Sequence, residues 1–509
     1  MRFNFSTKDK TAAVNHAGAK AYTLTPEMEL YTAIATTMLN DSFYEKADAR
    51  LARIKNLMTK VKAPFIAKLA VYARQEMNLR TAPVVLATEL AKIHKGDDLV
   101  AKMVEKVVKR PDEITEMLAY YQIANERTGN KKLNKFSKQL QKGLAASFNN
   151  FDEYQFAKYN RATEVKLRDA LFLVHPKARD EAQQLLFNKI VNNELAVPYT
   201  WETELSALGQ QTFTSAYAKK NAIKAKWEEL ISSRKLGYMA LLRNLRNILE
   251  SEVSKDHIKI VYEYLTNKTA VGNSKQLPFR FLAAYKELKA VDSGYTSYIM
   301  KALENALVLS VQNMKGFDLE TKVVIACDVS GSMQQPVSAK SKVLMYDIGL
   351  LLGMLLQSRC ENVLTGMFGD TWKTVPLPST GVLANVDAFY KREGEVGYST
   401  NGYLVLKDLI AKKYVADKIM LFTDTQLWDS NTNNQGAENT ISYQWNAYKK
   451  IAPNAKLYVF DLAGHKHVPL KVEQNGVHLI AGWSDKVFEV MDAIEDGANA
   501  LDAVKKIEL

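Results

Sequence analysis

One stretch decides the fold of the second part of this chain: Val323-Val324-Ile325-Ala326-Cys327-Asp328-Val329-Ser330-Gly331-Ser332-Met333. Its first five residues form an unbroken apolar run, which is typical of a buried strand in a parallel sheet. Asp328, Ser330 and Ser332 follow at alternate positions, around a turn that contains Gly331. Carboxylate and hydroxyl oxygens are hard ligands, suited to Mg²⁺ or Mn²⁺. The stretch therefore predicts an α/β domain with a cation site at a strand end.

Two later segments place further oxygen atoms at the same kind of position. Thr400 lies in the polar run Ser399-Thr400-Asn401, and Asp424 follows the apolar run Ile419-Met420-Leu421-Phe422 and Thr423. Each lies where a parallel sheet leaves a loop at the carboxyl end of a strand. Because Ser and Asp are also common turn residues, the pattern has two interpretations, a cation site or ordinary turn chemistry.

After residue 320, predicted strands and helices alternate along the chain. This alternation predicts a doubly wound α/β sheet. The domain has no G-x-G-x-x-G and no G-x-x-x-x-G-K-[ST] motif, so it shows no nucleotide-binding signature. The predicted strands are 322–327, 362–368, 417–423, 456–461 and 477–482, and the predicted helices are 338–357, 402–413, 438–451 and 485–498.

Before residue 320, nearly every segment has the period of an amphipathic helix. Pairs of short helices recur about every 40 residues, which suggests an α-solenoid of the HEAT or armadillo kind. We therefore expect a helical-repeat domain over residues 1–319 and the α/β domain over residues 320–509. The predicted helices are 27–39, 63–76, 83–94, 98–109, 112–121, 130–147, 163–174, 179–193, 201–208, 220–231, 235–249, 252–266 and 278–289.

Basic residues are concentrated in the helical part. Residues 1–319 contain 49 Lys and Arg against 34 Asp and Glu, whereas residues 320–509 contain 19 against 22, in agreement with the net charge of +12. A polyanionic partner such as RNA would explain this asymmetry, because phosphate contacts dominate nucleic-acid affinity. The alternative is a helical surface that simply has more Lys.

The oxygen-bearing residues Asp328, Ser330, Ser332, Thr400 and Asp424 resemble the metal-ion-dependent adhesion site of von Willebrand A domains. The resemblance implies Mg²⁺, or another divalent cation such as Mn²⁺, bound directly by the hydroxyls and directly or through water by the carboxylates. It also implies an open coordination position that accepts an acidic group of a partner.

The whole chain resembles the TROVE-domain proteins, that is, the Ro autoantigen and its bacterial relatives. The resemblance extends over nearly the full length, and the adhesion-site element opens its last domain. The matching stretches are Asn15-His16-Ala17-Gly18-Ala19-Lys20-Ala21-Tyr22, Phe43-Tyr44, Lys68-Leu69-Ala70-Val71-Tyr72-Ala73-Arg74, Met77-Asn78-Leu79-Arg80-Thr81-Ala82-Pro83 and Leu277-Pro278-Phe279-Arg280-Phe281-Leu282.

This resemblance implies a monomeric ring of helical repeats, closed by the von Willebrand A-like domain. It implies RNA binding in two places: single-stranded 3′ ends of misfolded RNA in a basic central hole, and small non-coding RNA of the Y type on the outer surface. The implied role is RNA quality control and stress survival, in bacteria often beside an exoribonuclease.

Lys158, Arg161 and His175 are the candidates for the outer RNA surface. They lie in segments that look like the family's RNA-contacting segments, where a Lys-Tyr pair, an Arg and a His before the next helix contact RNA. Arg161 is one place off the family's position if no gap is allowed. His175 has an alternative explanation as a cation at a helix C-terminus, where the helix dipole favours positive charge.

A second basic candidate is a stripe of four lysines, Lys131, Lys135, Lys138 and Lys142, at spacings that place them on one helix face. Like charges on one face repel, so a phosphate track would explain their alignment. An ordinary solvated face is the alternative.

No enzyme signature accompanies these features. The chain lacks G-x-S-x-G, H-E-x-x-H and C-x-x-C, and nothing supplies a general base for a metal-dependent nuclease. A non-enzymatic RNA-binding ring is the main hypothesis, and a metal-dependent scaffold that docks an acidic partner is the alternative. No apolar run reaches the roughly 18 residues of a membrane span and no secretory signal is visible, so we expect a cytoplasmic protein. Cys327 and Cys360 are expected to be reduced core thiols.

Overall fold

The chain forms two compact units, each assembled from separated segments. In this computed structural model, Met1–Leu57 with Leu265–Ala503 form the first unit, and Met58–Tyr264 with Val504–Leu509 form the second. The expected sequence boundary at residue 320 therefore falls inside the first unit. No helix among the described residues is long and apolar enough to cross a membrane. The structure describes residues 12–14, 20–36, 47–125, 136–276, 278–310, 320–336, 341–358, 360–427, 437–464, 467–472, 475–482, 490–491 and 501–509.

A six-stranded sheet forms the core of the first unit, and it confirms the doubly wound α/β prediction. The strand order is β5-β4-β3-β6-β7-β9, and all neighbours are parallel except the short edge strand β5. From β3, the chain adds β4 on one side of the sheet and β6 on the other, so the strand order reverses between β3 and β6. Ligands of doubly wound sheets bind at such a switch point. The strands are β3 (Val323–Asp328), β4 (Val363–Phe368), β5 (Trp372–Thr374), β6 (Lys418–Thr423), β7 (Lys456–Asp461) and β9 (Val477–Ala481).

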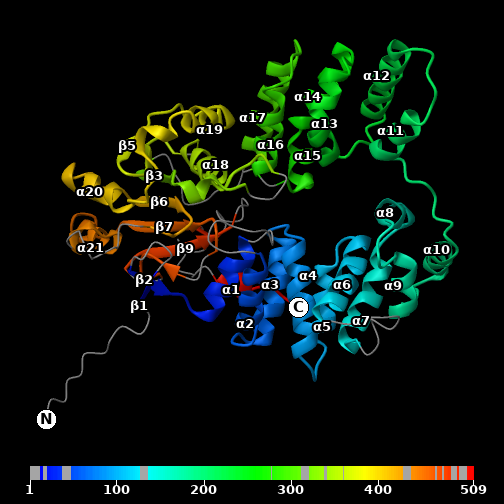
Figure 1. Ribbon diagram of the computed structural model, residues 1–509, viewed down its shortest axis with the longest axis horizontal. Coiled ribbons are helices and arrows are strands. Elements are labelled where there is room, and N and C mark those ends of the chain that lie inside the picture. Colours follow the sequence, from blue (N-terminus) through cyan, green and yellow to red (C-terminus); the bar gives the residue numbers. More distant parts are fainter. Residues whose placement is uncertain are drawn as a thin grey trace. The chain divides into compact units, whose positions relative to one another are not determined.

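Helices cover both faces of this sheet (Figure 1), with α18 and α19 on one side and α20 and α21 on the other. Gly353 of α18 shows how closely helix and sheet approach: a Cβ there would lie 2.9 Å from Cγ2 of Ile325. Cys327 and Cys360 are buried free thiols, as expected. These helices are α18 (Met345–Gln357), α19 (Val382–Tyr390), α20 (Tyr403–Ala411) and α21 (Ile441–Ile451).

Segments that precede the sheet in sequence complete the first unit. Strand β2 (Lys20–Thr23) pairs on one side with β1 (Ala12–Val14) and on the other with β8 (His467–Val468). This second, three-stranded sheet therefore joins an early segment of the chain to a late one. The Tyr31 hydroxyl donates to the Ala481 carbonyl at 3.5 Å, and Arg50 donates to the Ala463 carbonyl at 2.7 Å. The remaining helices are α1 (Pro26–Ala35), α2 (Ala47–Met58), α15 (Lys268–Ser274), α16 (Pro278–Leu288) and α17 (Thr296–Ser310).

The second unit is built of short helices stacked in order, which confirms the helical repeats. Helices that are neighbours or next neighbours in sequence pack together, as α3 does with α4 and α5, and α5 with α7. The end of the described chain, with α23 (Asp502–Lys505), is tied here because Lys68 and Lys106 donate to the carbonyls of Lys505 and Glu508. The helices are α3 (Ala63–Gln75), α4 (Thr81–Ile93), α5 (Leu99–Val107), α6 (Pro111–Ala124), α7 (Lys138–Ser147), α8 (Glu153–Tyr159), α9 (Leu167–Val174), α10 (Glu181–Asn192), α11 (Trp201–Gly209), α12 (Ala216–Ser232), α13 (Tyr238–Glu250) and α14 (Lys255–Leu265).

Candidate metal centre and nucleic-acid interface

The end of β3 brings the first three predicted metal-site residues together. Asp328, Ser330 and Ser332 are all buried, and the hydroxyl oxygens of the two serines lie 3.1 Å apart. Asp328 accepts hydrogen bonds from the Ser330 amide at 2.9 Å and from the Thr423 hydroxyl, across on β6, at 2.7 Å. The sharp turn at Gly331 therefore presents a carboxylate and two hydroxyls as one cluster.

The other two predicted residues lie at the same edge of the sheet. Asp424 follows the last residue of β6, and Thr400 lies in the loop that leads into α20; both side chains are buried. Asp424 accepts a hydrogen bond from the Gln426 amide at 3.0 Å. Thr423, which donates to Asp328, thus links the β3 loop to the β6 loop.

Burial and a neighbouring carboxylate change the acidity of Asp328. Desolvation and the charge of Asp424 raise the pKa of its carboxyl group to about 7, against the hydrogen bonds from Thr423 and Ser330. The two carboxyl groups therefore repel one another when both are ionised. A divalent cation would relieve exactly this kind of repulsion, since it favours the ionised form of both groups.

Sequence reasoning missed Asp461, a third carboxyl group at the next strand end. Asp461 ends β7, is fully buried, and accepts from the amides of Ala463 and Gly464 at 3.0 and 2.7 Å with one oxygen. Its other oxygen has no partner among the described residues. Burial raises its pKa to about 7, and Asp424 adds to the rise. The signal was present in the sequence, because an apolar run precedes this aspartate as it does Asp328.

The donor atoms fit a hard divalent cation. The site offers carboxylates and hydroxyls at the switch point of the sheet, which are the ligands that Mg²⁺ and Mn²⁺ prefer. Within the described ranges, no three His, Cys, Asp or Glu side chains form a ligand set by themselves. A cation here would therefore depend on the hydroxyls of Ser330, Ser332 and Thr400 as much as on carboxylates.

The predicted lysine stripe is partly described. Lys138 and Lys142 are exposed on α7, whose opposite face is buried through Leu140 and Leu144. Ser137 caps this helix, accepting from the amide of Leu140 at 3.4 Å. Lys131 and Lys135 lie outside the described residues.

The three outer-surface candidates lie around α8 and α9. Lys158 is exposed on α8, with its ammonium 5.5 Å from the Tyr154 ring and 5.8 Å from the Tyr159 ring. Arg161 is exposed in the following loop. His175 is exposed and ends α9 in a left-handed conformation with φ of 50°.

The structure adds five side chains to these candidates. Helices α8 and α9 both pack against α6. Arg110, which directly precedes α6, stacks over the Tyr159 ring at 4.1 Å, and Arg168 of α9 lies 5.8 Å from the Phe172 ring. Tyr154 and Phe172 are 45% and 50% exposed, so both rings are accessible to solvent. We call Arg110, Tyr154, Lys158, Tyr159, Arg168 and Phe172 the aromatic–basic surface.

Comparisons with known proteins bear on the family and the fold of the chain. The family model described as "TROVE domain" matches residues 19–203 and 191–326, more than half of the chain. Telomerase protein component 1 of Rattus norvegicus is 24% identical over 351 residues, and that of Mus musculus is 24% identical over 342 residues; each match covers 52% of this chain. The chain matches only 13% and 12% of the length of these curated relatives. The crystal structure of the Deinococcus radiodurans RO (RSR) protein has the same fold, with a TM-score of 0.59, 16% identity, and coverage of 91% of this chain and 99% of that one.

Proposed function

The chain belongs to the TROVE-domain family, and on that premise we propose that it is a non-enzymatic RNA-binding protein. The observation that supports this proposal is the aromatic–basic surface. Exposed aromatic rings beside Lys and Arg offer both contacts that RNA needs, because bases stack on the rings and phosphates pair with the cations. Tyr154 and Phe172 are each about half exposed, so a base can reach both rings.

We assign the two kinds of RNA to two surfaces of the second unit. The aromatic–basic surface, with Arg161 and His175, takes structured small non-coding RNA of the Y type. Lys138 and Lys142, with Lys131 and Lys135 in the same sequence stripe, contact the phosphates of single-stranded 3′ ends of misfolded RNA. This division rests on the family resemblance, as do the closed monomeric ring, the cytoplasmic location and an exoribonuclease partner.

Lysine and arginine position RNA in this proposal, whereas the aromatic rings select unpaired bases. Arg110 is already held in place by Asp112, with its Nε 3.0 Å from Oδ1. The Arg110 side chain is therefore already ordered against Tyr159, so RNA binding would cost it little conformational entropy. Lys158 contacts two rings, so a phosphate that it binds would place the adjoining base beside Tyr154 or Tyr159.

A second candidate function rests on the strand-end oxygen cluster. Asp328, Ser330, Ser332, Thr400 and Asp424 would hold Mg²⁺ or Mn²⁺. Such an ion supplies positive charge that can bind the carboxylate of an acidic partner protein. In this alternative the protein is a metal-dependent scaffold, and its RNA binding is incidental.

A salt series on two RNA ligands tests the proposal. Full-length protein is titrated into a hairpin RNA and into a 3′-tailed single-stranded RNA, with binding followed by electrophoretic mobility. Counterion release predicts a steep loss of affinity with rising salt. Lys158→Ala with His175→Ala is expected to weaken hairpin binding at least tenfold more than tail binding, and Lys138→Glu with Lys142→Glu to weaken tail binding more than hairpin binding.

The matched control is Lys259→Glu, a charge reversal at an exposed lysine of α14 in the same unit. It should change neither affinity by more than about twofold. If both variant pairs lose both ligands equally, the surface is generically basic. Absence of RNA binding by the wild-type protein at low salt would leave the metal-dependent scaffold as the better explanation.

A further inference from the structure

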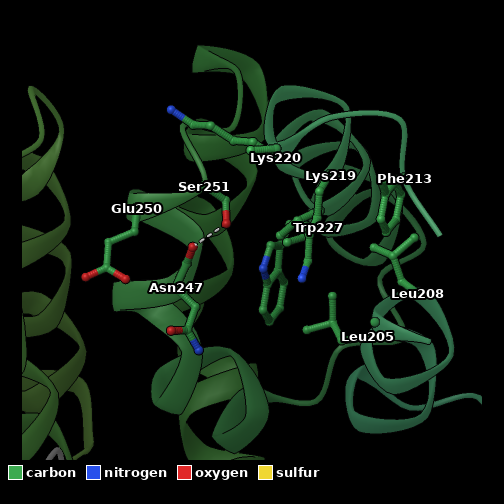
Figure 2. A pocket seen from close by; sticks show the side chains of 12 residues that line it. Leu205, Leu208, Phe213, Lys219, Lys220, Trp227, Asn247, Glu250 and Ser251 are labelled. Carbon is green, nitrogen blue, oxygen red and sulfur yellow. Dashed lines mark hydrogen bonds between the residues drawn. The ribbon is translucent and has the colours of Figure 1, made fainter. Parts of the chain in front are cut away.

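Three helices of the second unit leave an open pocket between them. It has a volume of 560 Å³, within the range of sites for small molecules. Figure 2 shows Trp227 at its centre, with Leu205, Leu208 and Phe213 on one side and Asn247 on the other. Every lining residue belongs to the segment 205–251, so α11, α12, α13 and the loop after α11 form the whole pocket.

The pocket exists because α11 and the first half of α12 are not packed into a core. No side chain of α11 is buried, and the 17-residue helix α12 buries only Trp227, Leu230 and Ile231 near its end. The Trp227 ring is held in place by stacking on Trp201, with centroids 6.2 Å apart and planes at 20°. Trp227 is therefore buried and fixed behind the pocket, while Leu205, Phe213 and Ile223 in front of it are partly exposed.

Two lysines and one glutamate, Glu250, line this largely apolar pocket. Lys219 and Lys220 line it, and Figure 2 shows the Lys219 ammonium pointing toward Trp227 and Leu205. Lys220 forms an ion pair with Glu252 at 2.7 Å, and Glu250 lies 3.9 Å from Arg246. Lys219 has no ion-pair partner among the described residues, so its charge is available to a ligand.

The combination of a partly exposed aromatic ring, Phe213, an apolar wall and the ammonium of Lys219 suits one class of ligand. We propose that the pocket binds a single unpaired nucleotide of an RNA chain, with the base against Phe213 and the Trp227 side of the pocket and the phosphate on Lys219. Asn247 also lines the pocket; its amide donates to Asn244 Oδ1 at 2.9 Å, which leaves its side-chain oxygen to accept from a base edge. This inference rests on the proposed RNA binding and adds a base-binding site to it, separate in sequence from the aromatic–basic surface.

A nucleotide explains the pocket better than an apolar partner helix does. A helix would cover the apolar wall, but it would also bury Lys219 without a partner, and unpaired buried charge is costly. A nucleotide covers the same wall and neutralises the ammonium. Base stacking on aromatic side chains is sequence-tolerant, so the site should accept any base.

The test uses full-length protein and a single-stranded RNA that contains one 2-aminopurine, whose fluorescence is quenched when it stacks. Binding to wild-type protein is expected to quench the probe, and Phe213→Ala and Lys219→Glu should each reduce the affinity of the quenched complex about tenfold. An RNA of the same length with abasic sites at all positions should bind wild-type protein about tenfold more weakly than the intact RNA. Phe213→Ala protein should bind the two RNAs equally. Adenosine monophosphate, titrated alone, should compete for the wild-type pocket.

Two controls separate this inference from the proposed function. Lys259→Glu reverses an exposed lysine away from the pocket and should leave quenching unchanged. Lys158→Ala should weaken hairpin binding while the pocket still quenches the probe. RNA binding by the wild-type protein without quenching, or quenching that survives Phe213→Ala and Lys219→Glu, would overturn the pocket and leave RNA binding intact. Loss of all RNA binding together with no competition by adenosine monophosphate would overturn both.

Discussion

At the scale of single residues, the strand-end carboxyl groups make the charge of the sheet edge sensitive to pH. Asp328 and Asp461 are buried at the ends of β3 and β7, on either side of β6, and burial raises the pKa of each to about 7. The protonated form of both groups is therefore favoured in the metal-free protein. Charge at this edge of the sheet depends on pH and on any bound cation.

Asp461→Asn should reduce the pH dependence of stability. The folded-state pKa of Asp461 is about 7, above the ordinary value of 3.8, so the folded state binds this proton more tightly than the unfolded state does. The stabilising contribution of the proton is complete below pH 4 and is lost as the pH rises to about 7. In urea denaturation with a chelator present, the wild-type free energy of unfolding should fall by a few kcal/mol over that window, and the variant should show a smaller fall. Equal slopes for both proteins would show that Asp461 is not the group that titrates.

The chemistry of the site could be predicted from single residues, but its full extent could not. Asp328, Ser330 and Ser332 are close in sequence, so their clustering follows from a strand and a tight turn. Asp461 has the same apolar run before it, yet nothing local shows that β7 lies beside β6. Arg110 and Tyr159 are likewise brought together by helix packing, and the distance of 4.1 Å between them has no counterpart in the sequence pattern.

At the scale of elements, close packing of α18 on the sheet limits what its residues can be. Gly353→Ala would place a Cβ 2.9 Å from Ile325 Cγ2, so helix or strand must shift. We expect a loss of about 1–3 kcal/mol in the free energy of unfolding, measured by urea denaturation. The matched control is Gly272→Ala in α15, where no atom lies within 4 Å of the added Cβ. There the helix should gain about 0.5–1 kcal/mol, and a loss of the same size in both variants would argue against the steric explanation.

Element prediction found the buried parallel strands but missed several short elements and some long helices, among them the 12-residue α2 and the 15-residue α17. All five predicted strands were found within one or two residues, because buried parallel strands read as apolar runs. The two-residue β8, the three-residue β1 and β5, and the seven-residue α8 are too short to show a period. No helix was predicted over α17, although Ile299, Leu303 and Leu307 recur at helical spacing and so indicate one. The predicted helix 485–498 lies outside the described residues, apart from residues 490 and 491.

At the scale of the whole molecule, the compact units cut across the expected sequence domains. Asp347 of α18 is fully buried and accepts hydrogen bonds from Lys286 of α16 and from the amide of Leu344 at 2.8 Å. Glu304 of α17 accepts from the amides of Leu383 and Ala384 at the start of α19. Helices that precede residue 320 are therefore part of the support of the α/β sheet.

The stabilities of separate fragments should follow the compact units and not the sequence boundary at residue 320. Residues 58–264 form most of one compact unit and should unfold cooperatively when produced alone, as followed by circular dichroism on heating. Residues 278–509 should be more stable than residues 320–509, because the shorter fragment leaves the Asp347 carboxylate without Lys286. Lys286→Met in the longer fragment is the matched control, and it should lower the melting temperature toward that of the shorter one. Identical melting temperatures for the two fragments would show that α16 and α17 contribute nothing to the sheet domain.

The pairing of β2 with β8 determines when the protein can finish folding during synthesis. Tyr31 and its partner Ala481 are separated by 450 residues. Strand β2 likewise cannot pair with β8 until that late segment has been synthesised. At ribosomal rates of about 5–20 residues per second, that wait lasts roughly 20–90 seconds. Throughout it, a nascent strand edge and the apolar face of α1 stay open to incorrect partners. The second unit emerges from the ribosome in one piece, apart from its last few residues, so most of it can fold before the first is complete.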